Sequence, residues 1–246
     1  RDWSSDVCSS DLMTEESIKP LRSVARKLAG LWPLLTEEEQ ARVEAAMEVK
    51  HYKKNHLVYA EGESPDHLLA VLSGKVKIFR DGVGGRSQIM RLLGPGQYLG
   101  YRAHMAHEPY VTAAAAFEEA DVAHVPMSLI SEIITENNRV ARFFIGELAK
   151  DLGISDRRMV SLTQKHVRGR LAESLLYLRD IYGIHSRDGR LMVQITREDL
   201  AAFSNMTTAN AIRTLMDFAK EGVLQVQGKD ILLTDLKLLE EISLQG

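Results

Sequence analysis

The sequence has very little cysteine, and this scarcity excludes several kinds of site. Its only cysteine is Cys8, so one chain can form neither an internal disulfide nor a cysteine-ligated zinc site or iron–sulfur cluster. Long apolar runs are also missing, because no stretch approaches the roughly 18 to 20 apolar residues that a membrane-spanning helix needs. We therefore expect a cytoplasmic protein with no membrane partner.

An excess of positive charge is the third thing that the sequence lacks. It has 31 Lys and Arg against 34 Asp and Glu, a formal net charge of −3. Nucleic-acid-binding domains tend to be basic, so the total argues mildly against such a partner. The distribution points the other way, because residues 138–170 hold eight Lys or Arg and only three Asp or Glu.

The length of 246 residues and the hydrophobic content of 45% suffice for two modest domains. Residues 1–12, RDWSSDVCSSDL, contain no secretory apolar region, and we interpret them as a non-native leader before Met13. We expect a sensor domain over 13–137, a long helix over 138–165 and a third unit over 166–246.

The first of these units reads as β structure from His51 to about Pro126, after a helix that Thr36 caps. Short segments with β-branched residues alternate with glycine turns, a pattern typical of a closed sheet or jelly roll. The hairpin loop after residue 79 contains Gly84-Gly85. We expect strands over 57–59, 67–72, 75–79, 88–93, 110–117 and 121–125.

The long helix over 138–165 carries apolar residues at alternating spacings of four and three. This heptad pattern, along a helix of roughly 40 Å, predicts a dimer seam. The alternative is that the helix packs only on its own sheet domain. The expected seam residues are Ala141, Ile145, Leu148, Leu152, Ser155, Met159 and Leu162.

The last unit has the pattern of a winged helix-turn-helix. A helix over 167–182 ends at Gly183, and a strand follows over 191–195. Thr196 and Thr207 then read as caps of two short helices, with Gly222 ending the second and a two-stranded wing after it. The expected buried face of the second helix is Ala211, Ile212, Leu215, Phe218 and Ala219.

The start of a second helix in such a motif enters the major groove of DNA. Here Thr208, Asn210 and Arg213 would meet base edges, and an arginine can donate twice to guanine. The expected phosphate contacts come from helix N-termini and the wing tip, at Thr196, Arg197, Thr207 and Lys229. Two alternatives stay open: Arg213 could pair with Asp217 one turn on, or the winged helix could bind protein.

These motifs resemble the cyclic AMP receptor protein / fumarate-nitrate regulator (Crp/Fnr) family. The segments TREDLA, TTANAIRTL, EGVL and QGK fall in family order, and the similarity extends over about residues 31–235. The resemblance implies an α+β fold: an N-terminal cyclic-nucleotide-binding-like β-roll (a jelly roll), a dimerisation helix and a C-terminal winged helix-turn-helix. It implies a homodimeric transcription regulator that binds double-stranded DNA and is not an enzyme, with RNA polymerase and a small-molecule effector as candidate partners.

The departures from the family pattern affect both binding sites. Where the family's second helix commonly starts Arg-Glu-Thr-Val, this chain has Thr208, Ala209, Asn210 and Ala211. Where cyclic-AMP-binding members have Gly-Glu-Leu and then Arg-Ser, it has Gly100-Tyr101-Arg102 and Tyr110-Val111, so the phosphate-binding arginine is missing. We expect no cyclic nucleotide cofactor, and an effector pocket at Gly100, Tyr101, Arg102, Tyr110, Val111 and Thr112.

Two other functions remain as alternatives. A metal-dependent cupin-like enzyme would need converging ligands, and the sequence offers only His104, His107 and His124. An HxxH pair in a polar loop lacks the helical spacing of a metalloenzyme motif, so we expect no metal site. A dimeric sensor that acts through protein contacts alone is the other alternative.

Overall fold

The computed structural model describes residues 28, 30–82 and 87–246. The leader at 1–12, with Cys8, and the Gly84-Gly85 loop lie outside these residues. None of the described helices is long and apolar enough to cross a membrane. The helices are η1 (Trp32–Leu34), α2 (Glu37–Ala46), α3 (Tyr101–Met105), α4 (Met127–Glu136), α5 (Asn138–Gln164), α6 (Val167–Tyr182), α7 (Arg197–Phe203), α8 (Thr208–Lys220) and α9 (Leu236–Gln245).

Two four-stranded antiparallel sheets form the N-terminal β-roll, in the strand orders β1-β8-β3-β6 and β2-β7-β4-β5. A separate two-stranded sheet pairs β9 with β10 in the C-terminal domain. The strands are β1 (Glu48–Tyr52), β2 (Leu57–Tyr59), β3 (His67–Ser73), β4 (Val76–Asp81), β5 (Ser87–Leu93), β6 (Tyr98–Leu99), β7 (Ala113–Ala116), β8 (Ala120–Pro126), β9 (Leu224–Gln227) and β10 (Asp230–Leu233).

Strand β3 shows why the β-roll needs near-continuous apolar segments. Successive side chains of a strand point to opposite faces. Leu69 and Val71 are buried with residues of the second sheet, whereas Leu68 and Ala70 are buried with residues of the surrounding helices. Both faces of β3 are therefore covered, and its run of apolar residues belongs to two cores.

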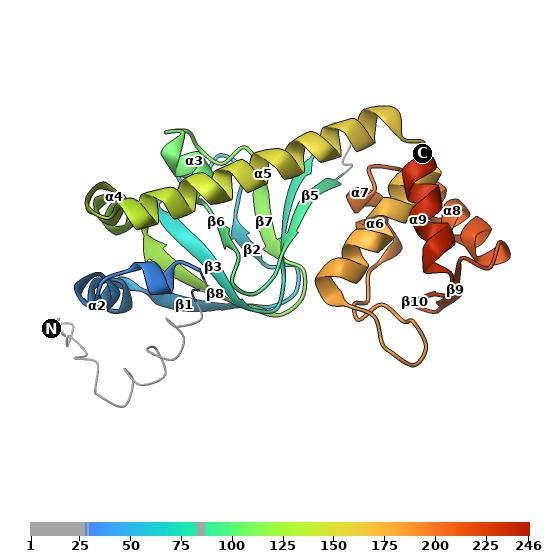
Figure 1. The fold of residues 1–246 in the computed structure, drawn as a ribbon, viewed down its shortest axis with the longest axis horizontal. Coiled ribbons are helices and arrows are strands. Elements are labelled where there is room, and N and C mark those ends of the chain that lie inside the picture. Colours follow the sequence, from blue (N-terminus) through green and yellow to red (C-terminus); the bar gives the residue numbers. More distant parts are fainter. Residues whose placement is uncertain (1–27, 29, 83–86) are drawn as a thin grey trace, which may run out of the picture.

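Helix α5 connects the β-roll to the C-terminal domain and is 27 residues long, about 40 Å (Figure 1). Asn137 caps it by accepting hydrogen bonds from the backbone N–H groups of Arg139 and Val140. Val140 and Phe144 are buried against the β-roll. The first half of α5 is thus anchored, and its second half extends to the junction with α6.

The C-terminal domain places helices α6 to α9 and the β9–β10 hairpin around one core (Figure 1). Thr196 caps α7 by accepting from the N–H of Asp199, and Thr207 caps α8 by accepting from the N–H of Asn210. Gly222 follows α8 with a φ of 77°, a left-handed conformation that favours glycine. The helix, turn, helix and hairpin of the sequence prediction are all present.

The structure corrects four expectations. The segment 191–195 is not a strand: it makes only isolated bridges, Ile184 to Leu191 and Arg190 to Leu232. The strand expected over 110–117 is shorter, because Tyr110 pairs with loop residues Gly62 and Glu63 instead of the sheet. Helices α3 and α9 were not expected.

The fourth correction concerns the buried face of α8. Ile212 was expected to be buried, but its exposed fraction is 45%.

Candidate nucleic-acid interface and effector pocket

The exposed face of α8 is mostly uncharged and carries one arginine. Ala211, Leu215 and Phe218 turn into the core, as predicted. The opposite face exposes Thr208, Ala209, Ile212, Arg213 and Met216, and Asn210 is half-buried beside it.

Arg213 makes no ion pair among the described residues, so the alternative in which Asp217 holds it is not realised. Asp217 instead lies 3.8 Å from the Lys220 ammonium. The Arg213 guanidinium is therefore available to a ligand on the open side of α8.

The expected phosphate-binding residues differ in their availability. Lys229 is exposed at the wing tip, after Gly228 with its φ of 61°. Arg197 is half-buried and donates to the carbonyl of Gly228 at 3.0 Å, so it fastens α7 to the wing. The Thr196 hydroxyl donates to the Asp199 carboxylate at 2.8 Å. Because Asp199 places negative charge at the start of α7, this end is less suited to a phosphate than the start of α8, where Thr207 is exposed.

Several contacts join the C-terminal domain to the β-roll, including the Lys75 ammonium over the ring of Tyr182 at 4.2 Å and two sets of polar contacts. The ammonium of Lys77 on β4 lies 2.9 Å from the carboxylate of Asp199 on α7, and both side chains are largely buried. Arg158 of α5 donates to the carbonyls of Ile89 on β5, at 3.1 Å, and of Phe203 at the end of α7, at 2.8 Å. The position of α8 relative to the β-roll is therefore set by these contacts in this conformation.

All six residues expected at an effector pocket line one cavity of about 450 Å³ between the β-roll and α5. Gly100 has a φ of 95°, and a Cβ there would lie 2.5 Å from the His67 carbonyl oxygen, so the position requires glycine. The rings of Tyr59 and Tyr110 stack with centroids 3.7 Å apart.

Two of the three arginines that line this cavity form ion pairs. Arg91 pairs with Asp151 at 2.6 Å, and Arg102 pairs with Glu108. The hydroxyl of Tyr101 also donates to Asp151, at 2.8 Å, and burial followed by this carboxylate raises the pKa of Tyr101 above its usual range. The third arginine, Arg158, pairs with no described carboxylate, but its guanidinium donates to the backbone carbonyls of Ile89 and Phe203.

The heptad positions of α5 leave an apolar stripe uncovered. Ile145, Leu152 and Met159 are 65%, 63% and 64% exposed, although each is a large apolar side chain. Ala141 and Leu148 are half-buried near the β-roll, Ser155 is exposed and Leu162 lies at the cavity wall. Because Val140 and Phe144 bury another face of the helix, packing on the β-roll does not account for this stripe.

Family models match both halves of the chain. A cyclic nucleotide-binding domain matches residues 49–137, and a Crp-like helix-turn-helix domain matches residues 169–242. The chain belongs to the Crp/Fnr family of transcription regulators.

Curated Crp/Fnr proteins align over most of their lengths. A CRP-like cAMP-activated global transcriptional regulator of Mycobacterium tuberculosis is 25% identical over 212 residues, covering 86% of this chain and 95% of that protein. The cyclic AMP receptor protein of Thermus thermophilus is 28% identical over 192 residues, covering 78% and 86%. An anaerobic regulatory protein of Haemophilus influenzae is 26% identical over 215 residues, covering 85% and 82%.

Solved structures support the fold of a Crp/Fnr protein. A Crp/Fnr-family regulator from Eubacterium rectale superposes with a TM-score of 0.75 at 20% identity, covering 88% of this chain and 98% of that one. FixK2 from Bradyrhizobium japonicum has a TM-score of 0.71 at 23% identity, covering 80% and 96%.

Two of the three histidines that suggested a metal site are held by other groups in this Crp/Fnr chain, and the third, His107, is exposed. His104 lies in helix α3, not in a loop as expected, and its ring nitrogens contact the Pro65 carbonyl at 3.0 Å and the Ser131 hydroxyl at 3.2 Å. His124 is buried and hydrogen-bonded to Tyr52 at 3.0 Å. Within 28, 30–82 and 87–246, no three His, Cys, Asp or Glu side chains gather as a metal site.

Sequence reasoning missed Ile212 and Met216 as part of the exposed face of α8. Because Ile212 is apolar, it was predicted on the buried side of the helix. The helical spacing from Ala211, Leu215 and Phe218 was the signal that could have placed both residues on the open side.

Proposed function

We propose that this Crp/Fnr regulator works in the cytoplasm as a homodimer that binds a two-fold, sequence-specific DNA site. The observation that carries the proposal is the exposed Arg213 on α8, which makes no ion pair with a described residue, in a winged helix that follows an apolar stripe on α5. Contact with RNA polymerase would accompany a role in transcription.

The DNA site should reflect the side chains on α8. Arg213 can donate two hydrogen bonds to the O6 and N7 of guanine, and Asn210 can pair with adenine. Ile212 offers no hydrogen bond, but an apolar side chain in the major groove can contact the methyl group of thymine. The exposed hydroxyl of Thr207 and the Lys229 ammonium would hold phosphates on either side.

Selection from a random duplex pool tests this function. We expect the purified chain to enrich a palindromic sequence with a guanine in each half-site. Replacing Arg213 by alanine should cost about 1 to 3 kcal/mol of specific binding and relax the preference at that guanine. Arg187, an exposed arginine of the same domain, is the control, and Arg187→Ala should leave the specific affinity unchanged.

Two outcomes would remove the proposal. One is a chain that enriches no sequence, and the other is an Arg213→Ala variant that binds the enriched site as well as the parent. A stable dimer with no salt-dependent affinity for DNA would favour the sensor that acts through protein contacts.

The effector pocket favours a neutral ligand over a cyclic nucleotide. A cyclic phosphate needs an available cation. Arg91 and Arg102 are held by Asp151 and Glu108, and the guanidinium of Arg158 is engaged by backbone carbonyls. Tyr110 and Val111 occupy the places where the family's phosphate-binding pair stands. Titration calorimetry with cyclic AMP should therefore show no binding at micromolar concentrations, and tight binding would contradict this assignment.

A further inference from the structure

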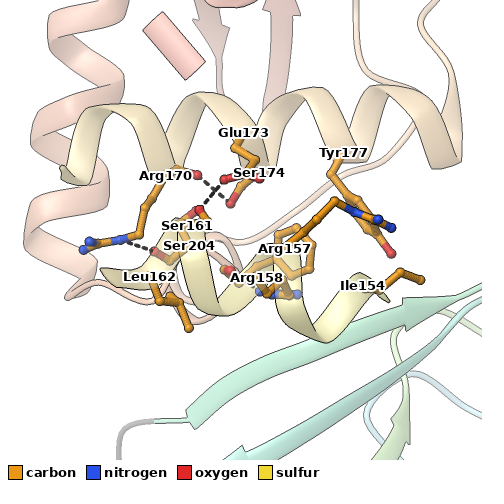
Figure 2. A pocket seen from close by; sticks show the side chains of 11 residues that line it. Ile154, Arg157, Arg158, Ser161, Leu162, Arg170, Glu173, Ser174, Tyr177 and Ser204 are labelled. Carbon is orange, nitrogen blue, oxygen red and sulfur yellow. Dashed lines mark hydrogen bonds between the residues drawn. The ribbon is translucent and has the colours of Figure 1, made fainter. Parts of the chain in front are cut away.

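A second cavity lies at the junction of the dimerisation helix and the DNA-binding domain. Its volume is about 230 Å³, and its walls come from the end of α5, from α6 and from the end of α7 (Figure 2). It is adjacent to the effector pocket, with which it shares Ile154, Arg158 and Leu162. No position that the sequence analysis assigned to an effector lines it.

The walls carry more positive than negative charge. Three arginines line the cavity, and in the described part of the chain none of them pairs with a carboxylate. Arg158 and Arg170 donate to backbone carbonyls, which do not neutralise their charge, and Arg157 is exposed with no described partner. Burial lowers the pKa of Arg158, as expected for a cation without a close counter-ion.

The one carboxylate in the cavity wall, Glu173, already has partners. Glu173 accepts a hydrogen bond from the hydroxyl of Ser161 and lies 3.3 Å from the ammonium of Lys165. The cavity therefore attracts anions in a partly enclosed space, where charge interactions are stronger than in bulk water.

The rest of the lining is mostly apolar, and of its three serine hydroxyls one has no partner among the described residues. The rings of Tyr177 and Phe203 lie 5.2 Å apart between their centroids, and Ile154 and Leu162 add aliphatic surface. The hydroxyl of Ser204 is buried, since the residue is only 2% exposed, and it has no hydrogen-bond partner in the described structure. A buried polar atom without a partner is costly, and a bound ligand can supply one.

The geometry points to a binding site for a small organic anion with an apolar body, of the class of aromatic or branched-chain carboxylates. The carboxylate would face Arg157, the apolar body would lie against Tyr177 and Phe203, and the Ser204 hydroxyl would hydrogen-bond to the ligand. The volume is below the 300 to 1,000 Å³ typical of drug-sized ligands, so the ligand is small.

Such a ligand would touch both the dimerisation helix and the DNA-binding domain. Arg157 and Leu162 belong to α5, whereas Phe203 and Ser204 belong to the end of α7. A bound ligand would therefore favour the orientation of the DNA-binding domain relative to α5 in which both walls contact the ligand.

Titration calorimetry on the full chain tests the site without DNA. The probes are phenylacetate, benzoate and isovalerate, each compared with its neutral amide, and inorganic phosphate. We expect at least one acid to bind about tenfold or more tightly than its amide and than phosphate. Equal binding of acid and amide, equal binding of phosphate, or no binding of any acid up to about 10 mM would overturn the proposal.

Matched variants locate the ligand. Arg157→Gln removes an exposed charge and should weaken binding by about tenfold or more, and Ser204→Ala should weaken it to a lesser degree. Arg187→Gln, on an exposed loop, and Arg102→Gln, in the other cavity, should leave it unchanged. If Arg102→Gln abolished binding of the acid and Arg157→Gln did not, the ligand would lie in the effector pocket and the proposal would be overturned. Because no DNA is present, either failure leaves the proposed DNA-binding function standing.

Discussion

At the residue scale, the partners of each arginine decide what it can bind. Arg91 and Arg102 face the effector pocket, but ion pairs hold them. Arg213 is exposed and unpaired in the described part of the chain, although it shares a helix with Asp217. Arginines of one sequence can therefore serve as structural pairs or as ligand contacts, and only their surroundings separate the two.

His124 makes stability depend on pH. Burial lowers its pKa to about 4, with further lowering by Lys50 and His67, against about 6.5 for an unfolded chain. Between pH 6.5 and 4 the unfolded chain takes up a proton that the folded chain does not, so the free energy of unfolding should fall across this range and stay level above it. Urea denaturation at pH 7 and pH 5 measures the change.

The control for this pH effect is His124→Gln, which cannot take up the proton. Its loss of stability between pH 7 and pH 5 should be smaller than that of the parent chain. Equal losses in both proteins would show that other groups cause the pH dependence.

Some residue roles could be predicted from the sequence, and some could not. Thr196 and Thr207 were recognised as caps because a cap depends on residues within one turn. The prediction that Ile212 is buried was wrong, because an apolar residue next to a core position in the sequence is usually taken to be buried. The partners of Arg158 could not be predicted, because its hydrogen bonds to Ile89 and Phe203 depend on how distant segments meet.

At the scale of secondary-structure elements, α5 has one face for the β-roll and another that the described residues leave uncovered. Phe144 is 1% exposed, whereas Leu152, on the heptad stripe, is 63% exposed. Exposed apolar surface in a continuous stripe favours association, because burying it removes it from water.

Replacing Leu152 by glutamate should therefore dissociate the proposed dimer. A carboxylate in the seam would lie opposite the same carboxylate of the other subunit and would lose its hydration. We therefore expect a monomer at micromolar concentration by analytical ultracentrifugation. Met192 is an equally exposed apolar residue at 64%, but it lies in the C-terminal domain away from α5. Met192→Glu should leave the dimer mass unchanged, and a dimeric Leu152→Glu protein would show that the seam lies elsewhere.

The two longest helices were predicted from their apolar periodicity, whereas some shorter elements, α3 and α9 among them, were not. The long helix and the helix at Val167–Tyr182 follow clear apolar spacings. The segment 191–195 alternates like a strand, but its residues reach only isolated bridge partners. Helix α3 is five residues long, which is too short for its period to show in sequence.

At the scale of the whole molecule, the structure links three units that could bind different partners. The effector pocket lies between the β-roll and α5, and α5 also carries the apolar stripe. The C-terminal domain, which contains α8, lies at the far end of α5 (Figure 1). Lys77 and Arg158 reach from the first two units to α7 and hold the DNA-binding domain in place. The order of these units could be predicted from the sequence, but the contacts between them could not, because each depends on the final packing.

The central claim is that two copies of α8 bind two half-sites on one face of DNA. Such an arrangement fixes the half-site separation at about one helical turn. The most direct measurement is the affinity of the chain for its selected site before and after about five base pairs are inserted at the centre, which rotates one half-site by about half a turn. We predict an affinity loss of about 100-fold or more. Unchanged affinity would contradict the account, because each α8 would then bind DNA independently of the other.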